Sequence, residues 1–239
     1  AGLVVVSVDD PLCPRVTSII DAETLAHPVA VAAQFRYAFV CVKEGVAVLD
    51  ITQPAKPRGV TGIKINEAHN IYVARTYAYV AAGSEGLVIL NVENPEEPKI
   101  DQVFNAGGCM NDVHDVKLGI TYVSEFAYVA DGKNGMRIVQ LTSPETPGNT
   151  GFSPRPTPNL IATYKLPKGG HALSITKALD RDRAGDECGN QIGVFGRIGA
   201  RPVNHEEQRK LYLRDGAVYR VSDDPADPQY RLNRKEERR

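Results

Sequence analysis

Residues 77–98 read YAYVAAGSEGLVILNVENPEEP, and the order of features in this segment is informative about the fold. Aromatic and small residues alternate first, a glycine-containing turn follows, and an apolar run then leads into a turn bounded by prolines. Short apolar segments between glycine and proline turns are typical of β-strands. The segment therefore predicts two antiparallel strands joined by a tight turn.

The apolar run that begins with glycine occurs five times. Its copies GLVVVSV, GVAVLDI, GLVILNV, GMRIVQL and GAVYRVS begin at Gly2, Gly45, Gly86, Gly135 and Gly216. Three successive intervals of 43, 41 and 49 residues fit one unit each, and the last interval, of 81 residues, contains insertions. Units of about 40–50 residues are typical of propeller blades.

Two further features complete the unit. A preceding strand reads YAFV, YAYV or FAYV, at 37–40, 77–80 and 126–129. Each apolar run is followed by a turn that contains proline, such as TQPAKPR or ENPEEPK. No stretch has a sustained helical period, so helical repeats are excluded. The pattern predicts an all-β propeller of four-stranded antiparallel blades, one of them with strands near 29–34, 37–43, 45–51 and 59–65.

Together, Tyr-Ala-Tyr-Val, the glycine turn, Gly-Leu-Val-Ile-Leu-Asn-Val and Asn-Pro-x-x-Pro resemble the LVIVD-repeat family. The best copy is 69–100, the resemblance covers residues 1–145 well, and the strand and turn return at 217–229. The resemblance implies a β-propeller of the kind found in secreted and cell-surface proteins of bacteria and archaea. Such proteins often have no known activity, and some are fused to or associated with multihaem cytochromes. It thus implies an extracytoplasmic location and a protein partner, either a multihaem cytochrome or another envelope protein.

We expect one propeller domain over residues 1–233, with insertions at 146–160 and 178–210 and a charged tail at 234–239. The chain begins inside a repeat, so it contains five third strands and four innermost strands. Two interpretations stay open. Either the N-terminal half-blade closes a ring of four or five blades with C-terminal strands, or the chain is the C-terminal part of a longer polypeptide with more blades.

Composition and motifs exclude several classes of function. The formal net charge of −1 argues against a nucleic-acid binder, and no apolar run approaches the length of a transmembrane segment. The common motifs of serine nucleophiles, phosphate-binding loops and zinc proteases are absent. The four cysteines form neither a Cys-x-x-Cys pair nor a covalent haem motif. Cys41 lies inside an apolar run and is predicted to be a buried free thiol.

Four histidines are expected to begin the innermost strand of successive blades and to form a ring at one mouth of the channel: His27, His69, His114 and His171. Neutral imidazoles suit iron, copper, nickel or zinc, so this ring is a candidate metal site. Neighbouring Glu67, Asp112 and Asp115 are candidates for hydrogen bonds to the ring nitrogens. The alternative is that the histidines are structural or line the channel without a metal.

Two segments outside the repeat are further candidates. The loop 180–191 contains a possible calcium set, Asp180, Asp182, Asp186 and Glu187, although Arg181 and Arg183 offset its charge and favour a solvated loop. The proline-rich segment 146–160 is predicted to be an exposed excursion. Either loop is a candidate for contact with a partner, and a passive linker is the alternative for 146–160.

Three classes of function remain. The absence of catalytic motifs favours a binding or scaffolding module of an envelope or multihaem cytochrome assembly. The first alternative is a metal-dependent oxidase or oxygenase that uses the four histidines, and the second is a structural surface or filament protein.

Overall fold

The computed structural model describes residues 2–10, 12–120, 124–149 and 151–176, together with the backbone of four two-residue strands within 197–218. The chain divides into two compact units, Ala1–Lys177 and Ala178–Arg239. In unit 2 the described backbone forms two short antiparallel hairpins, β15 (Arg197–Ile198) with β16 (Arg201–Pro202) and β17 (Leu213–Arg214) with β18 (Ala217–Val218). The candidate calcium residues lie outside the described residues, as does most of the insertion 178–210.

Unit 1 contains three four-stranded antiparallel sheets and one two-stranded sheet. In each four-stranded sheet, consecutive strands pair as neighbours, which gives a meander. The first blade consists of β3 (Ala30–Gln34), β4 (Tyr37–Val42), β5 (Gly45–Asp50) and β6 (Arg58–Lys64). The second consists of β7 (Asn70–Ala74), β8 (Tyr77–Ala81), β9 (Leu87–Asn91) and β10 (Lys99–Phe104). The third consists of β11 (Asp115–Ile120), β12 (Glu125–Ala130), β13 (Met136–Thr142) and β14 (Asn159–Tyr164).

The N-terminal hairpin is the two-stranded sheet, formed by β1 (Leu3–Ser7) and β2 (Arg15–Ile20). The only helix in the described residues is a single 3-10 turn, Pro167–Gly169. These elements confirm the all-β fold of propeller blades and the four strands predicted for the first blade. No closed ring is formed by the residues that the structure describes. No helix among them is long and apolar enough to span a membrane.

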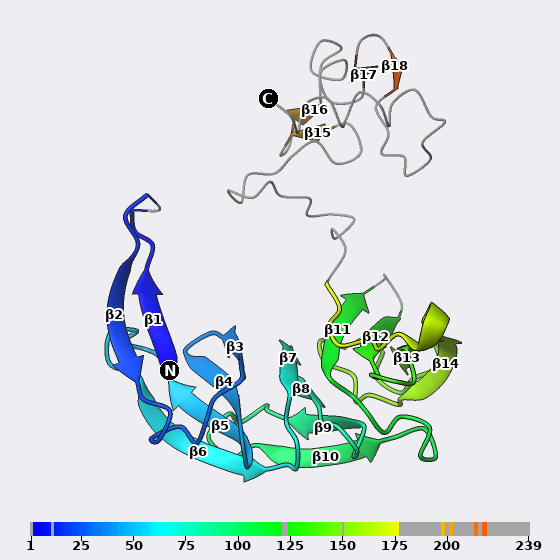
Figure 1. The fold of residues 1–239 in the computed structure, drawn as a ribbon, viewed down its shortest axis with the longest axis horizontal. Helices are drawn as coiled ribbons and strands as arrows, with labels where there is room; N and C mark the ends of the chain where they lie inside the picture. The colour runs from blue at the N-terminus through cyan, green and yellow to red at the C-terminus, as the bar shows by residue number, and fades with distance from the viewer. Residues whose placement is uncertain are drawn as a thin grey trace. The chain divides into compact units, whose positions relative to one another are not determined.

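The blades pack face to face along unit 1. The first strands β3, β7 and β11 lie on its inner side, and β6 and β10 run along its outer side (Figure 1). One apolar cluster joins the first and second blades and includes Phe39, Val48 and Ile71. A second cluster joins the second and third blades and includes Tyr79 and Val116. Every residue of β4 and β8 is buried, as the alternating aromatic and small residues predicted for a strand covered on both faces.

The glycine that begins each third strand is required by the backbone. Gly45, Gly86 and Gly135 have positive φ angles of 140°, 90° and 88°. A side chain at Gly86 would bring its Cβ within 2.6 Å of the carbonyl oxygen of Phe104, on the adjacent fourth strand. Only glycine tolerates both the conformation and this close approach. The repeat therefore keeps glycine at this position for a local reason.

The excursion 146–160 contains exposed residues, as predicted, among them Phe152, but part of it packs against the second blade. Pro154 and Pro156 are buried. Ser153 Oγ lies 2.6 Å from Thr76 Oγ1, and the Arg155 guanidinium donates to Asp101 at 3.1 Å. Proline-rich backbone cannot extend a sheet, but its carbonyls and side chains can contact a neighbouring sheet. The excursion leaves the third blade and lies against the second.

Cys41 is fully buried and unpaired, which confirms the prediction of a buried free thiol. Burial raises its pKa to about 12. Cys13 and Cys109 are exposed free thiols.

Candidate functional site

The register of the first strands decides which residues are equivalent from blade to blade. Backbone N–H groups of Val29, His69 and His114 donate to Cys41, Ala81 and Ala130 at 2.8–2.9 Å. These three acceptors hold the same position in β4, β8 and β12. Val29, His69 and His114 are therefore equivalent.

Two histidines lie elsewhere in the unit. His27 lies two residues before Val29, so it is equivalent to Glu67 and Asp112, and His27 and Glu67 share positive φ angles of 59° and 52°. The bridge between Gly132 and Ala172 repeats the bridge between Gly83 and Val113, so His171 is also equivalent to Asp112. The expectation that all four histidines hold one position is wrong. Register is set by backbone pairing with the second strand, which the identity of a side chain does not reveal.

Two rows of equivalent residues thus precede β3, β7 and β11 and recur at the bridge that follows the third blade. The turn row consists of His27, Glu67, Asp112 and His171. The entrance row consists of Val29, His69, His114 and Leu173. Each blade with a histidine in the entrance row has a carboxylate in the turn row, whereas His27 and His171 are followed by an exposed valine and leucine.

The carboxylates of the turn row hold the turn between the second and third strands. Glu67 Oε2 accepts from Ser84 N at 3.0 Å and from Ser84 Oγ at 2.9 Å. Asp112 Oδ2 accepts from Lys133 N at 2.9 Å. These hydrogen bonds, above all those from the backbone N–H groups, lower the pKa of both carboxyls. Each carboxylate therefore stabilises its own blade, whatever the function of the site.

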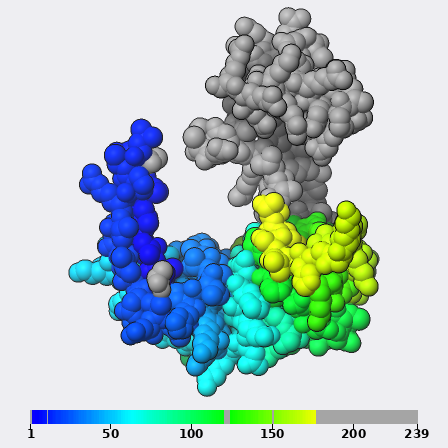
Figure 2. All heavy atoms as spheres, in the orientation of Figure 1, coloured from blue at the N-terminus to red at the C-terminus, as the bar shows by residue number. Residues whose placement is uncertain are grey.

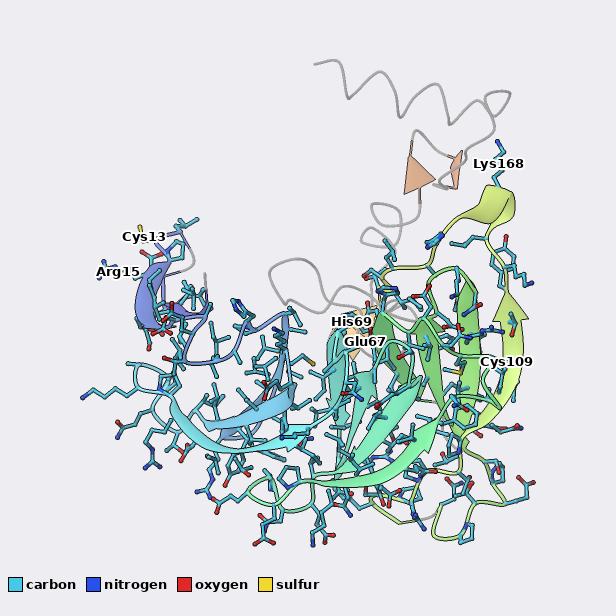
Figure 3. All side chains as sticks on the ribbon, turned by 60° about the horizontal axis from the view of Figure 1, so that its bottom comes forward. Cys13, Arg15, Glu67, His69, Cys109 and Lys168 are labelled. Atoms are coloured by element: carbon cyan, nitrogen blue, oxygen red, sulfur yellow. The ribbon has the colours of Figure 1, made fainter. Side chains whose placement is uncertain are left out.

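The two histidines of the entrance row form a pair. The rings of His69 and His114 stack with centroids 5.1 Å apart and an interplanar angle of 25°. Asp112 Oδ1 lies 3.0 Å from His114 Nε2. Glu67 and His69 lie close together at one end of the second blade (Figure 3). This is the one pair of histidine rings in contact within the described part of the chain.

A metal would need more ligands than this pair supplies. Among the described residues, no group of three or more His, Cys, Asp or Glu side chains is placed to hold a metal ion. Asp112 is placed to orient the ring of His114, whereas Glu67 binds Ser84 and Asp115 has other partners. The four-histidine metal site stays a prediction.

Asp115 joins three parts of unit 1. Its side chain is buried, and its Oδ1 accepts from Asn70 Nδ2 of the second blade at 2.7 Å and from Lys117 Nζ at 2.8 Å. Its Oδ2 accepts from Ser174 Oγ at 3.1 Å and from Ile175 N at 2.9 Å. Asn70 and Asp115 are equivalent, but the sequence offers no signal that they contact each other across 45 residues.

The third blade also contains a buried ion pair that was not predicted from the sequence. Arg137 Nε donates to Asp131 Oδ2 at 2.9 Å, and the side chains are 10% and 0% exposed. The guanidinium also donates to Thr163 Oγ1 and to the carbonyl oxygen of Cys109, both at 2.7 Å. An arginine within the apolar run GMRIVQL, with an aspartate six residues earlier, is the signal that could have indicated this pair.

These face-packed meanders, with their equivalent first strands, define a β-propeller repeat module. A family model described as LVIVD repeat matches residues 29–61, 66–105 and 120–148. Each match falls on one blade, and the chain belongs to the LVIVD-repeat family.

No curated protein matches the chain. A crystal structure of the computationally designed Ika4 protein is similar with a TM-score of 0.37 and 10% identity, covering 70% of this chain and 91% of that one.

Proposed function

We propose that this chain is an extracytoplasmic propeller module that binds or scaffolds a protein partner within an envelope or multihaem cytochrome assembly. The observation that supports this most is an exposed apolar face on the N-terminal hairpin. Val4 pairs with Ile19 and Val6 with Val16 across the two strands. All four side chains are 44–65% exposed. Contiguous exposed apolar surface is typical of protein interaction sites.

The hairpin is well placed for such contact. Its other face is occupied, because Leu3 and Ile20 pack against Leu25, Val40 and other residues of the first blade. The far end of the hairpin, in dark blue, projects beyond the blades of unit 1 (Figure 2). A partner could therefore cover the outer face without disturbing the blades.

The charged groups described above form structural hydrogen bonds, which also favours a binding function over catalysis. Asp115, Asp131 and Arg137 are buried and engaged in hydrogen bonds that join strands or blades. Glu67 and Asp112 bind backbone N–H groups of turns. The extracytoplasmic location and the cytochrome as partner rest on the family resemblance alone.

The proposal is tested in cells that produce the protein naturally. After fractionation and chemical cross-linking, we expect the chain in the envelope or secreted fraction, bound to a protein whose haem content is read by absorbance. The double variant Val4→Glu/Ile19→Glu should release the partner, because it places two charges in the apolar face. Val103→Glu, at an exposed valine of β10, is the control and should retain it. Recovery of the chain from the cytoplasm, or without a partner, would contradict the proposal.

The metal-dependent oxidase or oxygenase remains the second candidate function. It is supported by the stacked pair His69 and His114 with Asp112 beside it. Metal analysis of the purified chain after incubation with iron, copper, nickel or zinc tests it. One bound equivalent that is lost in His69→Ala and His114→Ala would support this function, and the absence of bound metal would reject it.

A further inference from the structure

The turn between β5 and β6 borders a pocket on the first blade. The volume of this pocket is about 610 Å³, which lies within the range of small-molecule sites. Its lining includes Arg36, from the turn between β3 and β4, and Asp50 and Arg58, which pair at the ends of β5 and β6. Gln53 and Lys56, from the β5–β6 turn itself, line it as well. The lining therefore contains three cationic side chains and one carboxylate.

The cations of this pocket are only partly neutralised. Arg58 Nη2 donates to Asp50 Oδ2 at 2.9 Å, and the Arg58 side chain is 77% exposed. Arg36 Nη2 lies 3.6 Å from Glu96 Oε1 of the second blade. The ammonium group of Lys56 has no partner among the described residues. Three cations against two carboxylates leave an excess of positive charge, and both guanidinium groups keep N–H donors that are free to bind a ligand.

The same turn occurs in the N-terminal hairpin and in the other two blades, which gives an internal comparison. In all four turns, the backbone N–H of one residue donates to the carbonyl oxygen three residues earlier at 2.8–3.0 Å. The accepting residues are Asp10, Gln53, Asn94 and Ser143, and the donating residues are Cys13, Lys56, Glu97 and Thr146.

The first blade differs from the other three turns at the accepting residue. The side chains of Asp10, Asn94 and Ser143 each accept from the backbone N–H two residues later, at 3.1–3.3 Å. Such a hydrogen bond stabilises a turn. Gln53 is longer by one methylene, and its side chain makes no such bond among the described residues. The Gln53 amide is therefore available to a ligand in the pocket that it lines.

The first blade also differs from the second in charge. The residue equivalent to Lys56 is Glu97, and the turn ENPEEPK of the second blade contains two further glutamates. The first-blade turn TQPAKPR contains no carboxylate. Because the same backbone forms with either charge, the turn itself does not require the basic lining of the pocket.

We propose that this pocket binds a small polar molecule that carries an oxyanion group, of the size of a sugar acid or a sugar phosphate. Arg36, Lys56 and Arg58 bind the oxyanion, because guanidinium and ammonium donors form strong hydrogen bonds with carboxylate and phosphate oxygens. The Gln53 amide binds a hydroxyl group of the same molecule. The site is distinct from the apolar face of the N-terminal hairpin and goes beyond the proposed partner binding.

Isothermal titration calorimetry of the full 239-residue chain tests the proposal with three probes: glucuronate, glucose-6-phosphate and uncharged glucose. We expect at least one of the two acids to bind saturably, with one molecule per chain, and glucose not to bind at the same concentrations. The acid that binds more tightly identifies the oxyanion as a carboxylate or a phosphate. In a backbone amide NMR titration, the shifts should be concentrated at Arg36 and residues 50–58.

Two variants exchange pocket residues for their counterparts in the second blade. Lys56→Glu should weaken binding of the acid at least about tenfold, because it replaces a charged donor by a carboxylate. Gln53→Asn should also weaken binding, since a shorter side chain that bonds its own turn is withdrawn from the ligand. Lys64→Glu is the matched control, because Lys64 is exposed at the other end of β6, and it should bind as the unmodified chain does. All three variants should keep the urea midpoint of the unmodified chain.

Several outcomes would overturn the inference. One is no saturable binding of either acid below about 10 mM. Another is glucose binding as tightly as the acids, or equal affinity in Lys56→Glu and Lys64→Glu. Amide shifts that leave Arg36 and residues 50–58 unchanged would place the ligand elsewhere and would also overturn it. Val4→Glu/Ile19→Glu should bind the acid as the unmodified chain does, so this inference and the proposed function can fail separately.

Discussion

At the scale of single residues, a few backbone positions account for the repeat. In each of the three blades, the glycine before the third strand has a positive φ angle and lies close to a carbonyl oxygen of the fourth strand. Glu67 and Asp112, the carboxylates of the turn row, each accept a hydrogen bond from a backbone N–H group in the turn between the second and third strands. Both features act within one blade, so they recur wherever the blade recurs.

Gly86→Ala should destabilise the protein. The φ angle of 90° strains any other residue, and the added Cβ would lie 2.6 Å from Phe104 O. Strain of this kind costs about 1–3 kcal/mol, and the close contact adds to it. Urea unfolding of the variant measures the loss. Gly59→Ala is the control, because its Cβ would meet nothing within 4 Å, and an equal loss in both variants would contradict the explanation.

Acid should destabilise the protein between about pH 4 and pH 2. Hydrogen bonds from Thr52, and then the Arg58 guanidinium, lower the pKa of Asp50 from 3.8 to about 2. Because the folded-state pKa is the lower one, ionised Asp50 stabilises the fold above about pH 4, and this contribution disappears as the pH falls through the folded value. Asp50→Asn should reduce the change in the urea midpoint over this range. An unchanged pH profile in the variant would refute the assignment.

At the scale of secondary-structure elements, buried polar groups connect strands of different blades through hydrogen bonds. Asp115 connects β7, β11 and the segment that follows the third blade. Asn70 holds the equivalent position in the second blade and contacts Asp115 directly. One position of the first strand therefore links neighbouring blades.

Asp115→Ala should cost about 3 kcal/mol of unfolding free energy, because it leaves several donors without an acceptor and removes the partner of Lys117. Asp115→Asn should cost less, since an amide already occupies the equivalent position at Asn70. Chemical denaturation of the two variants measures the difference. A loss under about 1 kcal/mol for the alanine variant would show that the hydrogen bonds of Asp115 are not important for stability.

At the scale of the whole molecule, each blade depends on its neighbour for burial. A first strand is covered when complete strands precede it, as in the second and third blades, and is exposed when they do not, as in β3. The same residue type at equivalent positions of different blades therefore contributes differently to the free energy of unfolding.

Val116→Ala should cost about 2 kcal/mol, because a fully buried valine loses two methyl groups and leaves a cavity. Val31→Ala, at the equivalent but exposed position, should cost less than about 0.5 kcal/mol. Thermal and urea unfolding of the two variants make the comparison. Equal costs of the two substitutions would mean that neighbouring blades do not determine burial here.

Much of the fold follows from the sequence because its signals are local. The glycines, the proline turns and the Tyr-Ala-Tyr-Val pattern each act over a few residues, and together they define the strands, the blades and the LVIVD family. The burial of Cys41 follows in the same way from an apolar run with alternating aromatic residues.

The equivalence of side chains between blades was decided only by the tertiary structure. Backbone pairing places His69 and His114 in one row and His27 and His171 in another, although the repeat pattern predicts one position for all four. The joint at Asp115 and the contact of 146–160 with the second blade likewise connect residues 45–77 positions apart. Register and long-range contacts depend on which backbone groups pair after folding, and a sequence pattern with a period of one blade contains no measure of that pairing.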